Sequence, residues 1–312
     1  MKTTGIIVTY RRYDLLKKNL EACLNQNGKL DALIIVDNCS KDGTVERLRD
    51  EYGNNKEIIV YELQENTGGA GGFYHGLKYA YDLGYDCCIL MDDDGRPFDN
   101  NTFEKLLNTY YREYVNGKPM MLNSIVICDE ANLTFGLSTI TTIDEATKAE
   151  SDGLIMNQCN LFNGTLVNRE LIELIGFPNK DFFIRFDEVD YFNRALDAGA
   201  FVATIVDSRY FHPTTSDKSV KKYLGIRFEN EYEAPWKEYY KVRNKFYLYK
   251  QNGKNSIWIF LKFLQYMLGV MLFDVKDRKN VLNSIRLGYK HAKRGKLGKV
   301  IEPGQKVINI KM

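Results

Sequence analysis

The sequence lacks the cysteine patterns of a disulfide scaffold or a zinc site. Its six cysteines form no CxxC pair and no metal-finger spacing, and several lie in apolar, strand-like runs, where free cysteine behaves as a small hydrophobic residue. The segment "MKTTGIIVTYRRYD" is not expected to act as a signal peptide, because its apolar run is short and charge follows it directly. These absences predict a reducing, cytoplasmic compartment.

A strong excess of either charge is absent too. The net charge is only +2 over 312 residues, which gives no general reason to expect a nucleic-acid partner. The charge is uneven, however: residues 274–299 hold nine Lys or Arg and two Asp, so this segment carries +7 and the remainder −5. A basic segment of this kind indicates an anionic partner. The chain shows no internal repeat and no low-complexity linker.

The N-terminal third alternates between apolar strands and helices. Strands are expected at 5–10, 32–37, 57–63 and 87–92, with helices between them at 14–26, 40–52 and 71–84. Strands that are apolar on both faces predict a parallel sheet in an α/β layer structure. Ligands of open α/β sheets bind beyond the carboxyl ends of the strands, so the polar segments there are expected to surround one crevice. These segments are Thr9–Arg11, Asp37–Ser40, Asn66–Gly72 and Asp92–Asp94.

Three adjacent carboxylates, Asp92, Asp93 and Asp94, follow the fourth expected strand. They repel one another, and an uncompensated cluster of anions is unfavourable in or near a core. Mg²⁺ usually binds through one or two carboxylates together with substrate phosphates, so the cluster indicates a metal-diphosphate site. The alternative is a polar turn whose acids suit the dipole of the helix that follows.

Three further segments are less decisive on their own. The glycines of "NTGGAGGFYHG" suit a backbone that approaches phosphate, or else a tight turn with close packing. Asp187, Glu188 and Asp190 lie beside aromatic residues, which can raise a carboxyl pKa into the range of a general base, but they also suit an acidic first helical turn. His212 follows a strand-like run and gains weight only if the fold brings it opposite the aspartates.

The order of these segments resembles the inverting family 2 glycosyltransferases with the GT-A fold. The resemblance rests on "IIVTY", "IIVDNCSKDGT", "ENTGGAGGF", "LMDDDG", "FFIRFDEVDYFNR" and "FHP", covers roughly residues 4–250, and is greatest for the bacterial galactofuranosyltransferases and rhamnosyltransferases. It implies an α/β fold with a mostly parallel central sheet and a C-terminal aromatic and basic helical extension. The implied domains are 1–235, with a nucleotide-binding half (1–98) and an acceptor half (99–235), and an extension at 236–312.

The resemblance also implies roles for individual residues. Asp92, Asp94 and His212 match the ligands of a Mn²⁺ or Mg²⁺ ion, and Glu188 falls where the galactofuranosyl branch carries its catalytic base, usually an aspartate. Because glutamate departs from that pattern, Asp187 remains an alternative base. The residues that match the nucleotide-sugar site are Thr9, Tyr10, Arg11, Asp37, Asn66, Gly68, Gly69, Gly72 and Asp93. Trp236 and Tyr239, with Tyr240, are either an acceptor platform or core aromatics.

The expected reaction moves a sugar from a nucleotide donor to a lipid-linked or polysaccharide acceptor. The family resemblance favours UDP-galactofuranose, with dTDP-rhamnose as the alternative. A nucleotidyltransferase would need a basic, glycine-rich loop after the first strand, and "TYRRYDLL" has no glycine. A lectin-like module would not need the set of metal acids, histidine and base.

Residues 256–273 form an apolar, aromatic stretch near the lower length limit for a spanning helix, interrupted by Lys262 and Gln265. Together with the basic segment that follows, they predict a helix lying in the headgroup plane at the inner face of the cell membrane. The alternative is a buried helix that packs on the catalytic domain or on a second subunit of a homo-oligomer.

Overall fold

The computed structural model describes residues 1–214, 219–223, 226–230, 233–272 and 275–307. The chain divides into two compact units. Unit 1 comprises Met1–Asn179 and Glu188–Thr214, and unit 2 comprises Lys180–Asp187 and Thr215–Met312. The predicted domain limit at residue 235 stays a prediction.

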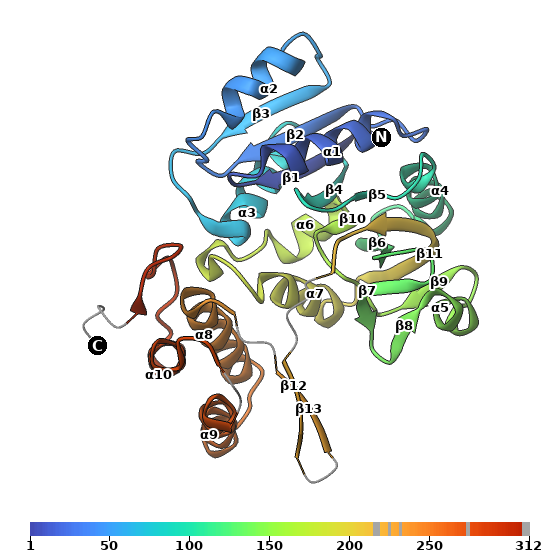
Figure 1. Ribbon diagram of the computed structural model, residues 1–312. Helices are drawn as coiled ribbons and strands as arrows, with labels where there is room; N and C mark the ends of the chain where they lie inside the picture. The colour runs from blue at the N-terminus through green and yellow to red at the C-terminus, as the bar shows by residue number, and fades with distance from the viewer. Residues whose placement is uncertain (215–218, 224–225, 231–232, 273–274, 308–312) are drawn as a thin grey trace. The chain divides into compact units, whose positions relative to one another are not determined.

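Unit 1 is built on one mixed sheet (Figure 1), in the order β3-β2-β1-β4-β10-β6-β11-β5. The strands β1 (Thr3–Thr9), β2 (Ala32–Asp37), β3 (Ile58–Glu62) and β4 (Cys87–Asp92) are parallel, so their carboxyl ends share one edge. β10 (Asn163–Asn168) runs antiparallel between β4 and β6 (Met120–Ile127), and β11 (Phe201–Phe211) lies parallel to β6. The predicted α/β layer structure is confirmed.

Alternation along each strand creates two separate cores. Ile6 and Val8 of β1 face one core, whereas Ile7 faces the other, because successive side chains of a strand point to opposite faces. Helices α3 (Gly68–Asp82), α6 (Arg169–Ile175) and α7 (Asp187–Asp197) supply buried residues to the first core. Helices α1 (Tyr13–Leu24), α2 (Thr44–Tyr52) and α4 (Thr102–Glu113) supply the second. Every strand of the parallel part is therefore apolar on both faces.

One expected boundary was wrong. The glycine-rich segment was expected to precede a helix beginning at residue 71, but α3 already begins at Gly68. A Cβ on Gly72 would lie 2.4 Å from Cγ1 of Val8, and one on Gly76 would lie 2.7 Å from Cγ2 of Ile6. Close contact between this helix and β1 therefore requires glycine, and it outweighs the poor helix propensity of that residue.

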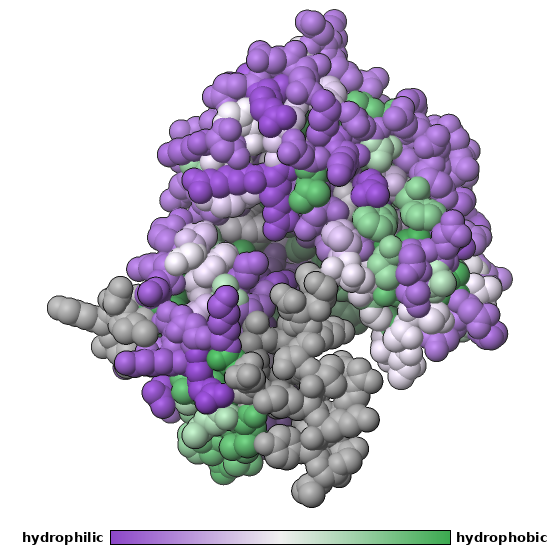
Figure 2. All heavy atoms as spheres, viewed as in Figure 1, coloured by the Kyte–Doolittle hydropathy of each residue, from purple (hydrophilic) through white to green (hydrophobic). Residues whose placement is uncertain are grey.

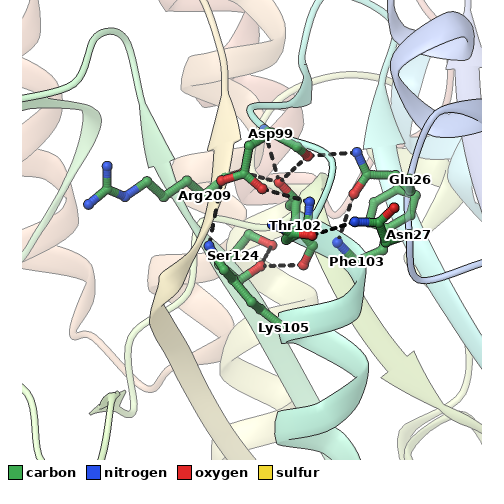
Figure 3. Close-up of polar contacts among 10 residues, drawn as sticks. Gln26, Asn27, Asp99, Thr102, Phe103, Lys105, Ser124 and Arg209 are labelled. Carbon is green, nitrogen blue, oxygen red and sulfur yellow. Dashed lines mark hydrogen bonds and ion pairs between the residues drawn. The ribbon is translucent and has the colours of Figure 1, made fainter.

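A group of hydrogen bonds fixes the segment that follows the aspartates. Figure 3 shows Gln26, just beyond α1, donating to the Asp99 carbonyl at 2.7 Å and accepting from the Phe103 amide at 3.0 Å. The Thr102 hydroxyl donates to the carbonyl of Arg209 in β11 at 2.9 Å. Next to these hydrogen bonds, β5 (Arg96–Pro97) pairs antiparallel with the end of β11. The stretch after β4 is thus held against β11.

The remaining elements of unit 1 form a small satellite around a third core. They are β7 (Asn132–Leu137), β8 (Ile140–Thr142), α5 (Ile143–Ala149) and β9 (Leu154–Met156).

Unit 2 is mainly helical. It contains a short 3₁₀ turn (Lys180–Phe182), a hairpin of β12 (Ser219–Tyr223) and β13 (Ile226–Asn230), and helices α8 (Pro235–Gln251), α9 (Ser256–Leu272) and α10 (Arg278–Arg294). A Cβ on Gly288 of α10 would lie 2.8 Å from the Tyr239 carbonyl of α8, so this glycine permits close packing of the two helices. Within the described residues, no helix combines the length and apolarity needed to cross a bilayer.

Candidate active site

Polar side chains from β1 and β4 meet at the shared carboxyl edge of the sheet. The Thr9 hydroxyl, at the end of β1, donates to Oδ2 of Asp93 at 2.8 Å, and both side chains are buried. Arg12 donates through one guanidinium nitrogen to Asp93 at 3.0 Å and to Asp94 at 2.8 Å. The structure therefore brings together the predicted residues Thr9, Asp93 and Asp94, and adds Arg12, which the sequence did not single out.

Strand pairing places His212 beside the cluster of Asp93, Asp94 and Arg12. Arg96 of β5 lies opposite Phe211 of β11, so Asp94, two residues before Arg96, comes close to His212, one residue after Phe211. The His212 Nε2 atom lies 3.2 Å from Oδ1 of Asp94, and its Nδ1 atom lies 2.8 Å from the Pro213 carbonyl. From the sequence, His212 gained weight only if the fold placed it opposite the aspartates, and the fold does so.

The three aspartates differ in charge environment. Burial, then the charges of Asp94 and Asp93, raises the pKa of Asp92 to about 8. Burial raises the pKa of Asp93 to about 6, although Arg12 and Thr9 oppose the shift. Burial also acts to raise the pKa of Asp94, but His212 and Arg12 outweigh it, and the net pKa is lowered. Asp92 is thus the carboxyl group with the least compensation.

The donor set suits a divalent cation. Within the described residues, the Asp92 carboxylate has no hydrogen bond or ion pair, and hard cations prefer such oxygen donors. A bound cation would relieve the mutual repulsion that raises the Asp92 pKa. In the part of the chain that is described, however, no three His, Cys, Asp or Glu side chains are already arranged around a metal position. Arg12 supplies the positive charge instead, and the predicted metal shell of Asp92, Asp94 and His212 stays a prediction.

A second polar cluster lies at the end of β2. Asp37 is buried and accepts from the Ser40 amide at 2.9 Å through Oδ2, whereas its Oδ1 atom has no hydrogen-bond partner among the described residues. Burial raises its pKa. Arg11 donates to Ser40 twice at 2.9 Å, through its backbone amide and its Nε atom, and its guanidinium lies 5.1 Å from the Tyr10 ring centroid. The unpartnered Asp37 oxygen is the kind of acceptor that a ligand N–H or hydroxyl would satisfy.

The first turn of α3 is tied to the same loop. The buried Asn38 accepts from the Thr67 amide at 2.9 Å and donates to the Gly68 carbonyl at 2.8 Å, while Asn66 accepts from the Gly68 amide at 2.8 Å. A Cβ on Gly69 would meet nothing within 4 Å. Packing therefore explains Gly72 but not Gly69, whose open surroundings leave room for a ligand.

Four of the eleven residues other than glycine with positive φ in the described chain lie at this edge. Arg11, Cys39, Lys41 and Phe162 have φ between 52° and 66°, a conformation uncommon for residues other than glycine. The first three follow β1 or β2, and Phe162 precedes β10, whose start lies beside the end of β4. Such conformations occur at functional sites, but the other seven lie elsewhere in the chain, so the bonded geometry above carries the assignment of this edge.

The remaining predicted residues lie outside the bonded cluster. Glu188 is half-buried on α7, and among the described residues no hydrogen bond or ion pair joins it to the aspartates. Asp187 is buried and belongs to unit 2. In that unit Tyr239 is fully buried, with its hydroxyl 2.7 Å from Nδ1 of His291, and Tyr240 is fully buried too. This burial favours the core-aromatic alternative for both tyrosines, while Trp236 is half-buried.

Comparison with known proteins identifies the family. The model described as "Glycosyl transferase family 2" matches residues 4–121. A galactofuranosyltransferase, GlfT1 of Mycolicibacterium smegmatis, is 33% identical over 81% of this chain and 84% of its own length. The chain belongs to glycosyltransferase family 2. The dTDP-rhamnosyl transferase RfbF of Shigella flexneri is 26% identical over 80% of each chain. This membership confirms the resemblance seen in the sequence and decides against a nucleotidyltransferase or a lectin-like module.

Solved structures support the GT-A fold of this family 2 glycosyltransferase. S. aureus TarS 1-349 is 13% identical over 95% of this chain and 73% of its own, with a TM-score of 0.53. A mannosyltransferase from Pyrobaculum calidifontis, solved with GDP-Man and Mn²⁺, is 15% identical over 94% of this chain and 73% of its own, with a TM-score of 0.52. GalNAc-T7, solved with UDP, GalNAc and Mn²⁺, is 10% identical over 94% of this chain and 56% of its own, with a TM-score of 0.59.

Proposed function

We propose that this family 2 glycosyltransferase moves galactofuranose from UDP-galactofuranose, with inversion, to a lipid-linked or polysaccharide acceptor in cell-surface glycan synthesis. The choice of sugar is supported by a relative named galactofuranosyltransferase at 33% identity, against 26% for the rhamnosyl relative. The observation that carries the chemistry is the convergence of Asp93, Asp94 and His212 at the carboxyl edge of the sheet.

The chain's own groups account for donor binding. Asp37 offers an unpartnered, buried oxygen to an N–H of the base or a ribose hydroxyl, with Thr9, Tyr10 and Arg11 at the neighbouring strand end. Gly69 lies in the first turn of α3, where backbone amides and the helix dipole favour the diphosphate. Thr9 and Arg12 hold the Asp93 carboxylate at the same edge of the sheet.

Asp92, Asp94 and His212 are the residues that would hold a divalent cation, Mn²⁺ or Mg²⁺, and when bound this cation would stabilise the negative charge of the departing diphosphate. Two of the structural neighbours were solved with Mn²⁺. Arg12 must then share or release Asp94, because one carboxylate oxygen is already occupied by its guanidinium.

Glu188 is the proposed general base. It takes the proton of the attacking acceptor hydroxyl, and attack opposite the leaving group inverts the anomeric carbon. Asp187 is the alternative, but its side chain is buried, whereas Glu188 is accessible. Trp236 remains a proposed acceptor contact.

A thermal-shift screen with Mn²⁺ tests the donor. UDP-galactofuranose should stabilise the protein more than dTDP-rhamnose, UDP-glucose or UDP-galactose. Calorimetry that shows tight dTDP binding and negligible UDP binding would replace the proposed sugar by rhamnose. Peripheral attachment at the cytoplasmic face of the membrane would suit a lipid-linked acceptor.

A further inference from the structure

One face of α9 is apolar yet uncovered. Seven of its large hydrophobic side chains are between 44% and 75% exposed: Ile257, Phe260, Leu261, Leu264, Leu268, Met271 and Leu272. Their spacing of three, four or seven residues places them on one stripe of the helix. The other side of α9, including Phe263, Met267 and Val270, packs into the core of unit 2. Figure 2 shows hydrophobic atoms gathered over this helix.

Basic residues flank both ends of this stripe. Lys254 precedes α9, and Lys250 donates to the carbonyl of Lys293 at 3.1 Å, which joins the ends of α8 and α10. At the other end, Lys276, Arg278 and Lys279 are exposed within seven residues after the helix, and with the exposed Asp277 among them residues 275–279 carry a net charge of +2. Lys262, which interrupts the apolar sequence, lies 5.5 Å from the ring centroid of Trp258 and does not divide the stripe.

We propose that this exposed stripe of α9, with its basic ends, is the surface by which the protein binds an anionic phospholipid membrane. Apolar side chains on one helical face enter the headgroup boundary, and lysines at the ends neutralise lipid phosphates. A second copy of the chain fits less well. A two-fold dimer through this stripe would set basic ends against basic ends in either helix direction, and these ends would repel.

The test is co-sedimentation of the full chain with phosphatidylcholine vesicles that contain, or lack, phosphatidylglycerol. Wild type should bind the anionic vesicles at low salt and be released as salt rises. The double variant Leu261→Ser, Leu268→Ser should weaken vesicle binding at least about tenfold, because each of these leucines would bury most of its side chain in the bilayer. Leu174→Ser, which removes a similarly exposed leucine from α6, should leave it unchanged.

Neutralising Lys276 and Lys279 should weaken binding to anionic vesicles only. The proposal is overturned if wild type fails to bind anionic vesicles at low salt, or if the serine variant binds as well as wild type. A wild-type dimer in analytical ultracentrifugation that dissociates in the serine variant would assign the stripe to a subunit interface instead.

A second, independent observation concerns the backbone just before the proposed base. Phe183, Arg185 and Phe186 all have φ between 65° and 68°, so three of the four residues that precede Asp187 are strained. Two fully buried side chains of α8 hold this loop. Asn244 donates to the carbonyls of Phe182, Ile184 and Arg185 at 2.8–3.0 Å.

Arg243 completes the support. Its guanidinium donates to the Phe182 carbonyl at 2.8 Å and to the Asp181 carbonyl at 3.1 Å, and it also reaches the Gly298 carbonyl beyond α10. Burial lowers its pKa. A buried guanidinium is costly unless its donors are satisfied, so the pair is suited to fixing carbonyl positions rather than to adding stability.

We infer that Arg243 and Asn244 are positioning residues for Glu188, an inference that rests on the proposed function. Arg243→Lys and Asn244→Asp both remove donors. Each should lower kcat about 100-fold with little change in donor KM, because small displacements of a catalytic group cost rates of this order. Hydrogen exchange of the amides at 183–188 should accelerate in both variants.

Val281→Ala is the matched control, because it removes buried volume from α10 away from the loop. If it lowers kcat as much as Asn244→Asp at equal loss of melting temperature, or if both loop variants keep wild-type kcat and exchange, the positioning role is refuted. If Glu188→Gln keeps wild-type turnover, Glu188 is not the base and the proposed function fails at that point. The hydrogen-exchange data would then still show whether Arg243 and Asn244 hold the loop.

Discussion

Two glycines three residues apart on α3 separate a packing role from a ligand-binding role. Gly72→Ala would place a Cβ 2.4 Å from Cγ1 of the buried Val8, near the carboxyl end of β1. Overpacking of this kind costs about 1–3 kcal/mol, so the urea midpoint should fall clearly. Gly69→Ala meets no atom within 4 Å and does not need positive φ. Its free energy of unfolding should stay level or rise by up to about 1 kcal/mol, since alanine favours a helix, so its urea midpoint should not fall.

The two substitutions should affect donor affinity in the reverse order: Gly69→Ala should weaken it, and Gly72→Ala should leave it nearly unchanged. If the diphosphate approaches the backbone at Gly69, the added methyl group should weaken UDP binding in calorimetry at least about tenfold, or about 1.4 kcal/mol. Gly72→Ala, measured well below its unfolding midpoint, should bind UDP within a few-fold of wild type. Wild-type UDP affinity in Gly69→Ala, or a loss of stability as large as that of Gly72→Ala, would refute this division of roles.

Three further predictions concern charge. Asp92→Asn and Asp94→Asn should each abolish the thermal shift caused by Mn²⁺ and stop transfer while the fold remains intact; near wild-type turnover in EDTA-treated buffer would refute the metal assignment. Glu188→Gln should lower kcat by about 10²–10⁴ with little change in donor affinity, whereas a dead Asp187→Asn beside an active Glu188→Gln would move the base to Asp187. Burial and the charge of Lys296 lower the pKa of His291 to about 4, below its ordinary 6.5, so its contribution to stability is complete above that ordinary value and is lost as pH falls towards 4. The urea midpoint of His291→Gln should therefore vary less with pH over that window than that of wild type, and an identical dependence would contradict the shift.

The sequence predicted the elements whose pattern is local. Runs such as "ALIIVD" are apolar on both faces, and only a strand covered by helices on both sides buries them fully. The start of α3 was missed because four glycines in five residues argue against a helix, and only contact with Val8 in β1 shows why they are tolerated. Tertiary contact decided that boundary.

The site was predicted where side chains follow strands, and missed where the partner comes from elsewhere. Arg12 is an exposed arginine in "TYRRYD", and no spacing in the sequence links it to Asp93, eighty-one residues away. Arg243 and Asn244 lie in the charged and aromatic run "YYKVRNKF", typical of a helix surface, yet both are fully buried against loop carbonyls. Pairing of β5 with β11 brings Asp94 to His212, and the sequence grouped these two residues only through the family resemblance, not through their spacing.

The most direct measurement is Mn²⁺-dependent hydrolysis of UDP-galactofuranose by the purified chain, in which water accepts the sugar and UDP is released, with dTDP-rhamnose and UDP-galactose run in parallel and Glu188→Gln as the control. The account predicts turnover of UDP-galactofuranose that EDTA stops, little or no turnover of the other two donors, and a loss of at least about 100-fold in Glu188→Gln. Turnover of dTDP-rhamnose alone, or turnover of UDP-galactofuranose that survives both EDTA and the Glu188 substitution, would contradict it.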